Sequence, residues 1–319
     1  MPRALRNPDW IDNRLLTTNK IDDLPESFFD ETREALSKFR SDNPLVSIVV
    51  PAFNEEFTII RTLHSLSRNK TTYPVEIIVV NNNSTDRTQI VLDKLNVKSV
   101  FQPVAGWGPA RQAGQEKAIG KYILSADADS FYPPQWIQIL TTALLKDNIS
   151  CVYGGYSYLG TEEYPRWKFF FYESFRDIIR AMRHIKRPHF NARGLNMGYP
   201  RELGLRKGYV YRKVKGEDGR MCFDLMQYGK VVQVTSDKTQ VWTLPRYLKQ
   251  DGGMLFSFLN HGLTELKRFK NYFKPFPKHD THTSVNSERP ALKYLKKSGV
   301  KPEQKAVSEP KEEQPNILS

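Results

Sequence analysis

The sequence predicts an α/β fold in which helices cover a mostly parallel, doubly wound sheet. Two short runs rich in Val and Ile, residues 45–50 (LVSIVV) and 75–80 (VEIIVV), are typical of strands buried on both faces of a parallel sheet. Between them, the apolar residues of the segment 55–69 recur at helical spacing. A strand, a helix and a second strand in this order form a βαβ unit.

The pattern repeats along the next stretch of the chain. We predict a helix over 86–96, a strand over 97–102, a helix over 109–119 and a strand over 121–126. The carboxyl ends of parallel strands meet at one edge of such a sheet, and ligands bind there. The polar segments that follow these four strands are therefore where we expect a functional site.

Later elements are less regularly spaced. Residues 136–145 are predicted to form a helix, and residues 151–158 and 230–234 are predicted to form strands. The aromatic and basic region 161–190 is predicted to be helical.

The first 44 residues are polar. We expect residues 1–44 to form a helical lead-in that lies outside the core. A helix over 26–39 would bring Phe28 and Leu36 to one face, and Pro44 closes the segment.

Composition is that of a globular protein. Of 319 residues, 39% are hydrophobic and 12% aromatic, which is enough for a sizeable core. Cys151 and Cys222 have no metal-ligand spacing and favour a reducing compartment. No apolar run reaches the roughly 18 to 20 residues of a membrane span, and residues 1–10 lack the apolar stretch of a signal peptide. We therefore predict a cytoplasmic protein.

The formal charge of +13 is concentrated in two regions. Residues 161–215 hold 14 Lys or Arg against 5 Asp or Glu, and residues 266–319 hold 12 against 6. Such an excess suits nucleic acid, an anionic membrane surface or phosphorylated substrates. No nucleic-acid partner is expected, because no DNA-binding or RNA-binding signature accompanies the charge. Residues 263–273 (LTELKRFKNYF) could form an amphipathic helix that binds the inner face of a membrane peripherally, or a solvated basic helix.

An Asp-Ala-Asp sequence follows the fourth strand. Asp127 and Asp129 could form ordinary turn hydrogen bonds, or their carboxylates could hold Mg²⁺ or Mn²⁺. The sequence contains neither a P-loop nor a Gly-x-Gly-x-x-Gly motif, so it lacks the signatures of ATPases and dinucleotide oxidoreductases. A metal ion on the Asp pair would hold phosphate groups by another route.

Four blocks of sequence, in order, resemble the inverting family 2 glycosyltransferases, whose catalytic domain has the GT-A fold. They are VSIVVPAFNEE, EIIVVNNNSTDRT, GPARQAGQEKAIGKYILSADADS and KGEDGRM, and the resemblance covers roughly residues 45–253. It implies a catalytic domain over 45–269, divided into a nucleotide-binding half (45–130) and an acceptor-binding half (131–269). The Pro-, Lys-, Ser- and Glu-rich residues 270–319 are expected to be a disordered tail.

The resemblance implies a set of donor contacts. The loop after the first strand would hold the nucleotide base through Pro51, Ala52, Asn54 and Glu55. In the second loop, Asn81 and Asn82 stand where acids are common in the family, so Asn82 would contact the base as an amide. Arg111 would contact the base or phosphates, although a solvated helix arginine is an equal alternative. We expect Asp86 to cap the next helix.

The resemblance also implies the metal and catalytic residues. Asp129 would coordinate the cation directly, and Asp127 would lie toward the ribose and the metal. Asp218 would be the general base, with Glu217 orienting it or acting as the base itself. A glycine-flanked surface turn is the alternative interpretation of this last block.

Weaker matches concern the acceptor and the diphosphate. Gly194, Asn196 and Arg201 match a segment that lines the acceptor side in the family. Arg246 would lie near the diphosphate, with Tyr247 in place of a second arginine, and a structural salt bridge is the alternative.

The predicted function is metal-assisted transfer of a sugar, by single displacement with inversion, from a nucleoside diphosphate sugar to an acceptor hydroxyl. UDP is the favoured nucleotide, Mg²⁺ or Mn²⁺ the cofactor, and a glycan or lipid-linked molecule of polysaccharide biosynthesis the acceptor. Two alternatives remain open: a sugar nucleotidyltransferase, although the loop PAFNEE lacks glycine, and a catalytically silent nucleotide-sugar-binding protein. Three tryptophans could stack on sugars or pack in the core, namely Trp107, Trp136 and Trp167.

Overall fold

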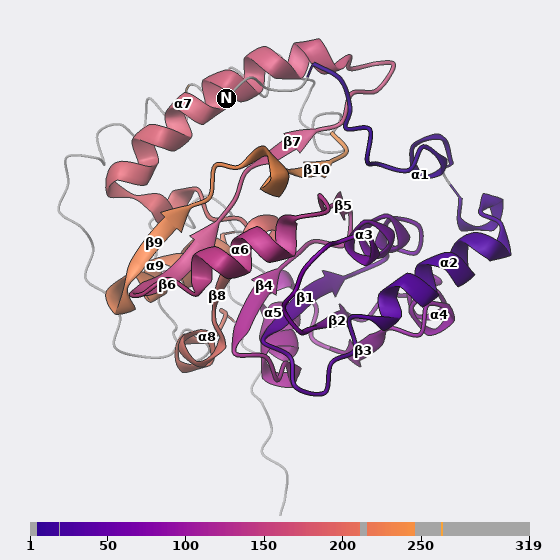
Figure 1. Cartoon of the computed structure of the whole chain (residues 1–319), viewed down its shortest axis with the longest axis horizontal. Coiled ribbons are helices and arrows are strands. Elements are labelled where there is room, and N and C mark those ends of the chain that lie inside the picture. Colours follow the sequence, from indigo (N-terminus) through magenta and orange to yellow (C-terminus); the bar gives the residue numbers. More distant parts are fainter. Residues whose placement is uncertain (1–4, 19, 211–215, 246–262, 264–319) are drawn as a thin grey trace, which may run out of the picture. The chain divides into compact units, whose positions relative to one another are not determined.

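A seven-stranded sheet organises the chain (Figure 1). The computed structural model describes residues 5–18, 20–210, 216–245 and 263. The strand order is β3-β2-β1-β4-β8-β6-β9. The bounds are β1 Val46–Ala52, β2 Val75–Asn81, β3 Lys98–Phe101, β4 Tyr122–Ser125, β6 Ile149–Tyr153, β8 Met197–Pro200 and β9 Lys230–Gln233.

The register aligns the carboxyl ends of the first strands. Val49 of β1 lies opposite Ile78 of β2 and Ser125 of β4, and all neighbouring strands in this half are parallel. The strand β8 is antiparallel to both β4 and β6, and it begins with Met197 opposite Ser125. The predicted α/β class with a mostly parallel sheet is therefore confirmed, with one reversed strand at its centre.

Helices lie on both faces of the sheet. Along β1, Ile48 and Val50 pack on one face with α3, whereas Val49 packs on the other with α5. This burial on both faces explains the uninterrupted Val and Ile runs. The helix bounds are α1 Arg14–Thr17, α2 Glu26–Ser37, α3 Thr58–Ser67, α4 Thr88–Lys94, α5 Trp107–Lys117, α6 Trp136–Leu144, α7 Arg166–Lys186, α8 Arg201–Lys207 and α9 Glu217–Leu225.

The predicted strand 151–158 is two strands in the structure. After β6 the chain leaves the large sheet at Gly154 and enters β7 (Tyr156–Tyr158) of a three-stranded sheet, beside β10 (Val241–Thr243) and β5 (Ser130–Phe131). A β-carbon on Gly154 would lie 2.3 Å from the Asn196 amide nitrogen, so only glycine allows this close packing. The sequence did not indicate β5, β8, β10, α8 or α9.

The N-terminal segment is part of the core, which corrects our expectation of a separate lead-in. Phe28, Phe29, Leu36 and Phe39 are buried in the same cluster as the sheet residues, and α2 packs on α3. The predicted helix 26–39 ends at Ser37. Because many residues of this segment are polar, the sequence did not predict that its apolar face covers the sheet.

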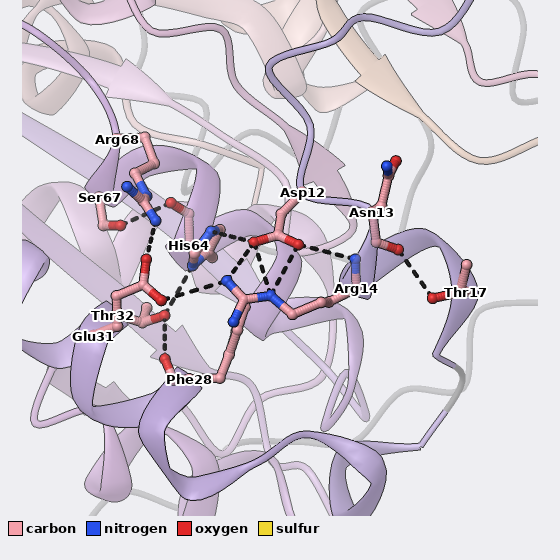
Figure 2. A network of polar contacts seen from close by, with 10 residues as sticks. All are labelled: Asp12, Asn13, Arg14, Thr17, Phe28, Glu31, Thr32, His64, Ser67 and Arg68. Atoms are coloured by element: carbon pink, nitrogen blue, oxygen red, sulfur yellow. Dashed lines mark hydrogen bonds and ion pairs between the residues drawn. The ribbon is translucent and has the colours of Figure 1, made fainter.

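A buried histidine connects this segment to α3 (Figure 2). His64 Nδ1 lies 2.9 Å from the Thr32 hydroxyl, and its Nε2 lies 3.6 Å from the Asp12 carboxylate. Asp12 in turn accepts a 2.6 Å hydrogen bond from Arg14. Burial, aided by the charge of Arg68, lowers the pKa of His64 to about 4, against the attraction of Asp12.

Within the described residues, no helix combines the length and the apolar composition that crossing a membrane requires. All described residues belong to the unit Met1–Ser287. The predicted disordered tail, 270–319, and the basic segment 264–273 lie outside the described residues.

Acidification should destabilise the fold through His64. Because its pKa is about 4 in the folded protein and 6.5 in the unfolded chain, the unfolded chain binds more protons between these values. The free energy of unfolding should have its full value above pH 6.5, where His64 is neutral in both states. It should fall by about 3 kcal/mol as the pH approaches 4. Urea denaturation as a function of pH measures this. The His64→Gln variant should flatten the dependence and His184→Gln should largely retain it; identical pH dependence in His64→Gln and wild type would refute the assignment.

Candidate functional site

A buried arginine occupies the centre of the site. The Arg111 side chain, on α5, is only 3% exposed, and its Nη2 donates a 2.6 Å hydrogen bond to Asp127 Oδ1. Its Nε lies 3.0 Å from Asp218 Oδ1, and its Nη1 donates to the Ser125 hydroxyl. One guanidinium therefore brings together the end of β4 and the beginning of α9, and the structure places two predicted site acids on the same cation.

Gly194 completes this contact. Its backbone N–H donates to Asp218 Oδ2 at 2.7 Å. A β-carbon on Gly194 would lie 1.9 Å from Arg111 Nη2 and 2.6 Å from Asp218 Oδ1, so a larger residue cannot occupy this position without moving both groups. Gly194 comes just before β8, which begins opposite Ser125, and this brings it to the edge of the sheet where β4 ends.

Asp218 lies in the first turn of α9, where the helix dipole favours negative charge. Its side chain is 14% exposed. The segment is thus a helix start, and the interpretation of this block as a glycine-flanked surface turn is wrong.

The site carries more carboxylates than the arginine can balance. Burial raises the pKa of Asp127 to about 6, and the carboxylates of Asp129 and Asp218 add to this against the opposing effect of Arg111. Burial and the neighbouring Asp218 likewise raise the pKa of Glu217 to about 7. Asp218, Asp127 and Glu217 all act on the one guanidinium, and Asp129 adds a fourth acid beside Asp127, so the environment is one that a further cation would stabilise.

The residues present fit a divalent cation held by few protein ligands. The Asp127 side chain is 35% exposed, and Asp129 is partly exposed and accepts a 3.2 Å hydrogen bond from Ser130. The part of the chain that the structure describes contains no cluster of three or more His, Cys, Asp or Glu side chains arranged for a metal. Mg²⁺ is usually bound in this way, through one or two carboxylates together with water and phosphate oxygens.

Buried hydroxyl groups fix the backbone of the Asp-Ala-Asp segment. The backbone N–H of Asp127 donates to the Tyr132 hydroxyl at 2.7 Å, and this hydroxyl donates to the Leu195 carbonyl at 3.1 Å. Thr62 on α3 donates to the Asp127 carbonyl at 3.1 Å. The sequence analysis missed Thr62, Tyr132 and Ser125, because their roles depend on partners that are distant in the sequence.

The first two strand-end loops are joined by side-chain hydrogen bonds. Asn54, in the left-handed region with φ 53°, accepts a 2.8 Å hydrogen bond from the backbone of Thr85, and Glu55 N–H donates to Thr88 Oγ1 at 2.9 Å. Pro51 and Ala52 end β1 at this edge. Asp86 accepts from the N–H of Thr88, the first residue of α4, but the residue at the N-cap position is Arg87, so Asp86 is not the cap that we predicted.

Asn82 joins the second loop to the third. Its Nδ2 donates to the carbonyls of Gln102 and Val104, at 3.0 and 2.6 Å, and its Oδ1 accepts from Gly106 N–H at 2.8 Å. A carboxylate could not make the two donor bonds. The amide of Asn82 thus holds the second and third loops together, which a carboxylate could not do.

Not all predicted residues reach the site. Asn196 is buried, with its Nδ2 donating to Gly155 and Thr239 carbonyls and its Oδ1 accepting from Trp136, so its amide holds the fold together. Arg201 corrects our expectation, because its Nε donates to the Gln115 carbonyl at the opposite edge of the sheet. The four residues of the antiparallel strand β8 carry the chain from Gly194 away to that edge.

The remaining predicted residues divide by environment. Trp136 packs in the core, whereas Trp107 and Trp167 are exposed. Arg246 and Tyr247 lie outside the described residues.

Comparisons of the sequence with a family model and with known proteins indicate the same family. The family model described as "Glycosyl transferase family 2" matches residues 47–204. Chondroitin synthase from Pasteurella multocida (strain Pm70) is 34% identical over 116 residues, which are 34% of this chain and 12% of that protein. UDP-Glc:alpha-D-GlcNAc-diphosphoundecaprenol beta-1,3-glucosyltransferase from Escherichia coli is 32% identical over 123 residues, or 36% of this chain and 47% of that protein. The chain thus aligns with less than half the length of either relative.

Solved structures show a more distant likeness. Glucosyl-3-phosphoglycerate synthase from Mycobacterium tuberculosis, in complex with Mn²⁺, UDP-glucose and phosphoglyceric acid, has a TM-score of 0.48 and 21% identity, covering 70% of this chain and 78% of that one. The mannosyltransferase PcManGT from Pyrobaculum calidifontis, in complex with GDP-Man and Mn²⁺, has a TM-score of 0.48 and 18% identity, covering 68% and 63%.

Introducing the acid common in the family should damage this protein. Asn82→Asp would leave the carbonyls of Gln102 and Val104 without donors and place a carboxylate between them. We expect the free energy of unfolding to fall by roughly 2 to 4 kcal/mol in urea denaturation. Asn83→Asp is the matched control, because Asn83 is adjacent and exposed, and it should change stability little. Equal effects of the two substitutions would contradict the structural role of Asn82.

Proposed function

We propose that this chain, which the match of residues 47–204 identifies as a family 2 glycosyltransferase, transfers a sugar from a nucleoside diphosphate sugar to an acceptor hydroxyl by an inverting single displacement. The observation that carries the proposal is the convergence of Asp218, Arg111 and Asp127 at the edge where β4 ends. The proposed base, Asp218, and the proposed donor-binding acid, Asp127, are there held by one guanidinium, and such fixed positions favour a single-step transfer.

We assign the role of general base to Asp218. Two fixed partners orient its carboxylate: Gly194 N–H donates to one oxygen, and the Arg111 guanidinium lies 3.0 Å from the other. The positive charge of Arg111 stabilises the carboxylate, and an oxygen lone pair remains to accept the proton of the acceptor hydroxyl as that hydroxyl attacks the anomeric carbon. Glu217 is the alternative base, since the pKa of this buried neighbour lies near 7.

The donor would lie across the ends of β1, β2 and β4. We propose that Pro51, Ala52, Asn54 and Glu55 line the base pocket, and that Asn82 contributes by holding the third loop closed over it. Asp127 and Asp129 would hold Mg²⁺ or Mn²⁺, with Asp129 as the direct ligand and Asp127 shared with the ribose. When bound, this cation would neutralise the charge that develops on the leaving diphosphate.

The acceptor is proposed by analogy. The Escherichia coli relative is named for transfer from UDP-glucose to a sugar on diphosphoundecaprenol. We propose a UDP-linked donor and a glycan or lipid-linked acceptor, approaching from the side of Gly194. Cys151 and Cys222 are both free and buried, which supports a reaction in the reducing cytoplasm.

Two observations argue against the alternatives left open by the sequence. A sugar nucleotidyltransferase would belong to a different family, and a silent binding protein would have no need of a carboxylate as tightly oriented as that of Asp218.

Replacing the base should abolish transfer without abolishing donor binding. In Asp218→Asn we expect kcat to fall by roughly 10²- to 10⁴-fold, which is the usual contribution of a general base. The Kd for the donor, measured by calorimetry, should change little. Asp147→Asn, at an exposed position, is the matched control and should keep full activity. If Asp218→Asn is active and Glu217→Gln is not, the base is Glu217.

Metal dependence is tested separately by thermal shift. Nucleoside diphosphate sugars should raise Tm more in the presence of Mn²⁺ than in its absence, and one donor should exceed the others. Asp129→Asn should lose the Mn²⁺-dependent part of this shift, whereas Asp237→Asn, an exposed control, should retain it. Transfer that continues after thorough chelation would show that Asp127 and Asp129 do not act through a metal.

A further inference from the structure

The helix α7 carries an exposed apolar stripe that the proposed reaction does not use. It contains 21 residues, about 30 Å of helix, and its buried residues all lie within the first eight positions. Six of the fifteen exposed large hydrophobic side chains of the described residues lie on this one helix. They are Trp167 (54% exposed), Phe171 (67%), Phe175 (40%), Ile178 (62%), Met182 (49%) and Ile185 (79%).

These side chains share one face. Their separations of three or four residues are those of a continuous helical stripe. Figure 1 shows α7 along the edge of the unit, with β7 and β10 on its inner side, and α7 packs against β7. A contiguous apolar surface of this kind on a soluble domain marks an interaction site more often than a solvated face.

The charge of the helix identifies the chemistry of the partner. Arg166 and Glu173 form a buried ion pair at 2.7 Å and neutralise each other. Asp177 is then the only other acid of the helix. Among the other basic residues, Arg176 and Arg180 lie over the rings of Tyr156 and Tyr153 within the fold, so the exposed basic residues of the helix are lysines. Lys168 and Lys186 are exposed at the two ends of the helix. Their long side chains could reach lipid phosphates while a membrane buries the apolar stripe between them.

We propose that α7 docks this protein on an anionic phospholipid surface, with the helix lying in the plane of the interface. An apolar face with aromatic residues and a basic flank is the composition that binds such surfaces. A second copy of the chain fits less well, because a symmetric contact through α7 would bring two sets of exposed lysines together. The inference does not depend on which sugar is transferred.

The position of α7 connects this surface to the catalytic groups. The helix leads directly into a short turn, Pro188–Phe190, which packs against α9. Gly219, next to Asp218, approaches the His189 carbonyl so closely that a β-carbon there would lie 2.9 Å from it. A membrane bound through α7 is thus separated from the proposed base by one short segment.

Vesicle co-sedimentation of the full chain tests the proposal. The protein should sediment with mixed phosphatidylcholine–phosphatidylglycerol vesicles and not with phosphatidylcholine alone. The double variant Ile178→Ser/Ile185→Ser should weaken this binding by roughly tenfold or more. The matched control is Ile90→Ser/Ile119→Ser, which removes two comparably exposed isoleucines, 62% and 56%, outside α7 and should bind as wild type does.

Three results would overturn the proposal. Absence of binding to anionic vesicles at low salt would exclude a lipid surface. Equal binding by the α7 variant and the control would place the contact elsewhere, for example in the basic residues 266–319. A wild-type dimer that dissociates in the α7 variant, seen by light scattering without vesicle binding, would assign the stripe to a second copy. Unchanged Tm in both variants verifies that the comparison is between folded proteins.

Discussion

The ion pairs of Arg111 are the interaction on which the site depends. A guanidinium that is 3% exposed loses almost all contact with water, and an unpaired charge in that position would cost several kcal/mol. Asp127 and Asp218 compensate for this loss, and they come from segments distant in the sequence. The same contacts that allow Arg111 to be buried therefore fix the distance between the proposed donor-binding edge and the proposed base. The close approach of Gly194 leaves little space for any other arrangement.

The loops around this centre are fixed by amide side chains. Asn54 holds the first loop to the second, and Asn82 holds the second to the third. Loops at the ends of parallel strands have few backbone partners, so side-chain hydrogen bonds replace them. The result is that the proposed donor-binding edge is ordered by the protein itself, so ligand binding there would have less conformational entropy to overcome.

Two surfaces outside this edge have opposite character. The N-terminal segment looks polar in sequence, yet it buries Phe28 and Phe29 over the sheet and places His64 where it stays neutral. The helix α7 does the reverse, since it exposes the apolar side chains of Phe171 and Ile185. In the first case the structure uses the apolar face to complete the core; in the second, that face is available to a partner.

The sequence by itself determined the repeating elements and the local chemistry. Hydrophobic periodicity is a local property, so β1 to β4 and α3 to α6 could be predicted within a few residues, and strand-end logic identified the Asp127 segment. The family resemblance added Asp218, Gly194 and Arg111, and the structure brings these three together.

Tertiary structure alone decided which polar groups meet. It showed that β8 is reversed and carries Arg201 away from the site, and that Asn196 and Gly154 pack together and divide a predicted strand in two. It also showed that Asn82 is needed as a donor to the third loop. Each of these outcomes depends on contacts between residues tens of positions apart. Such contacts leave no periodic signal in one sequence, because a hydrogen-bond partner is set by the fold and not by its neighbours along the chain.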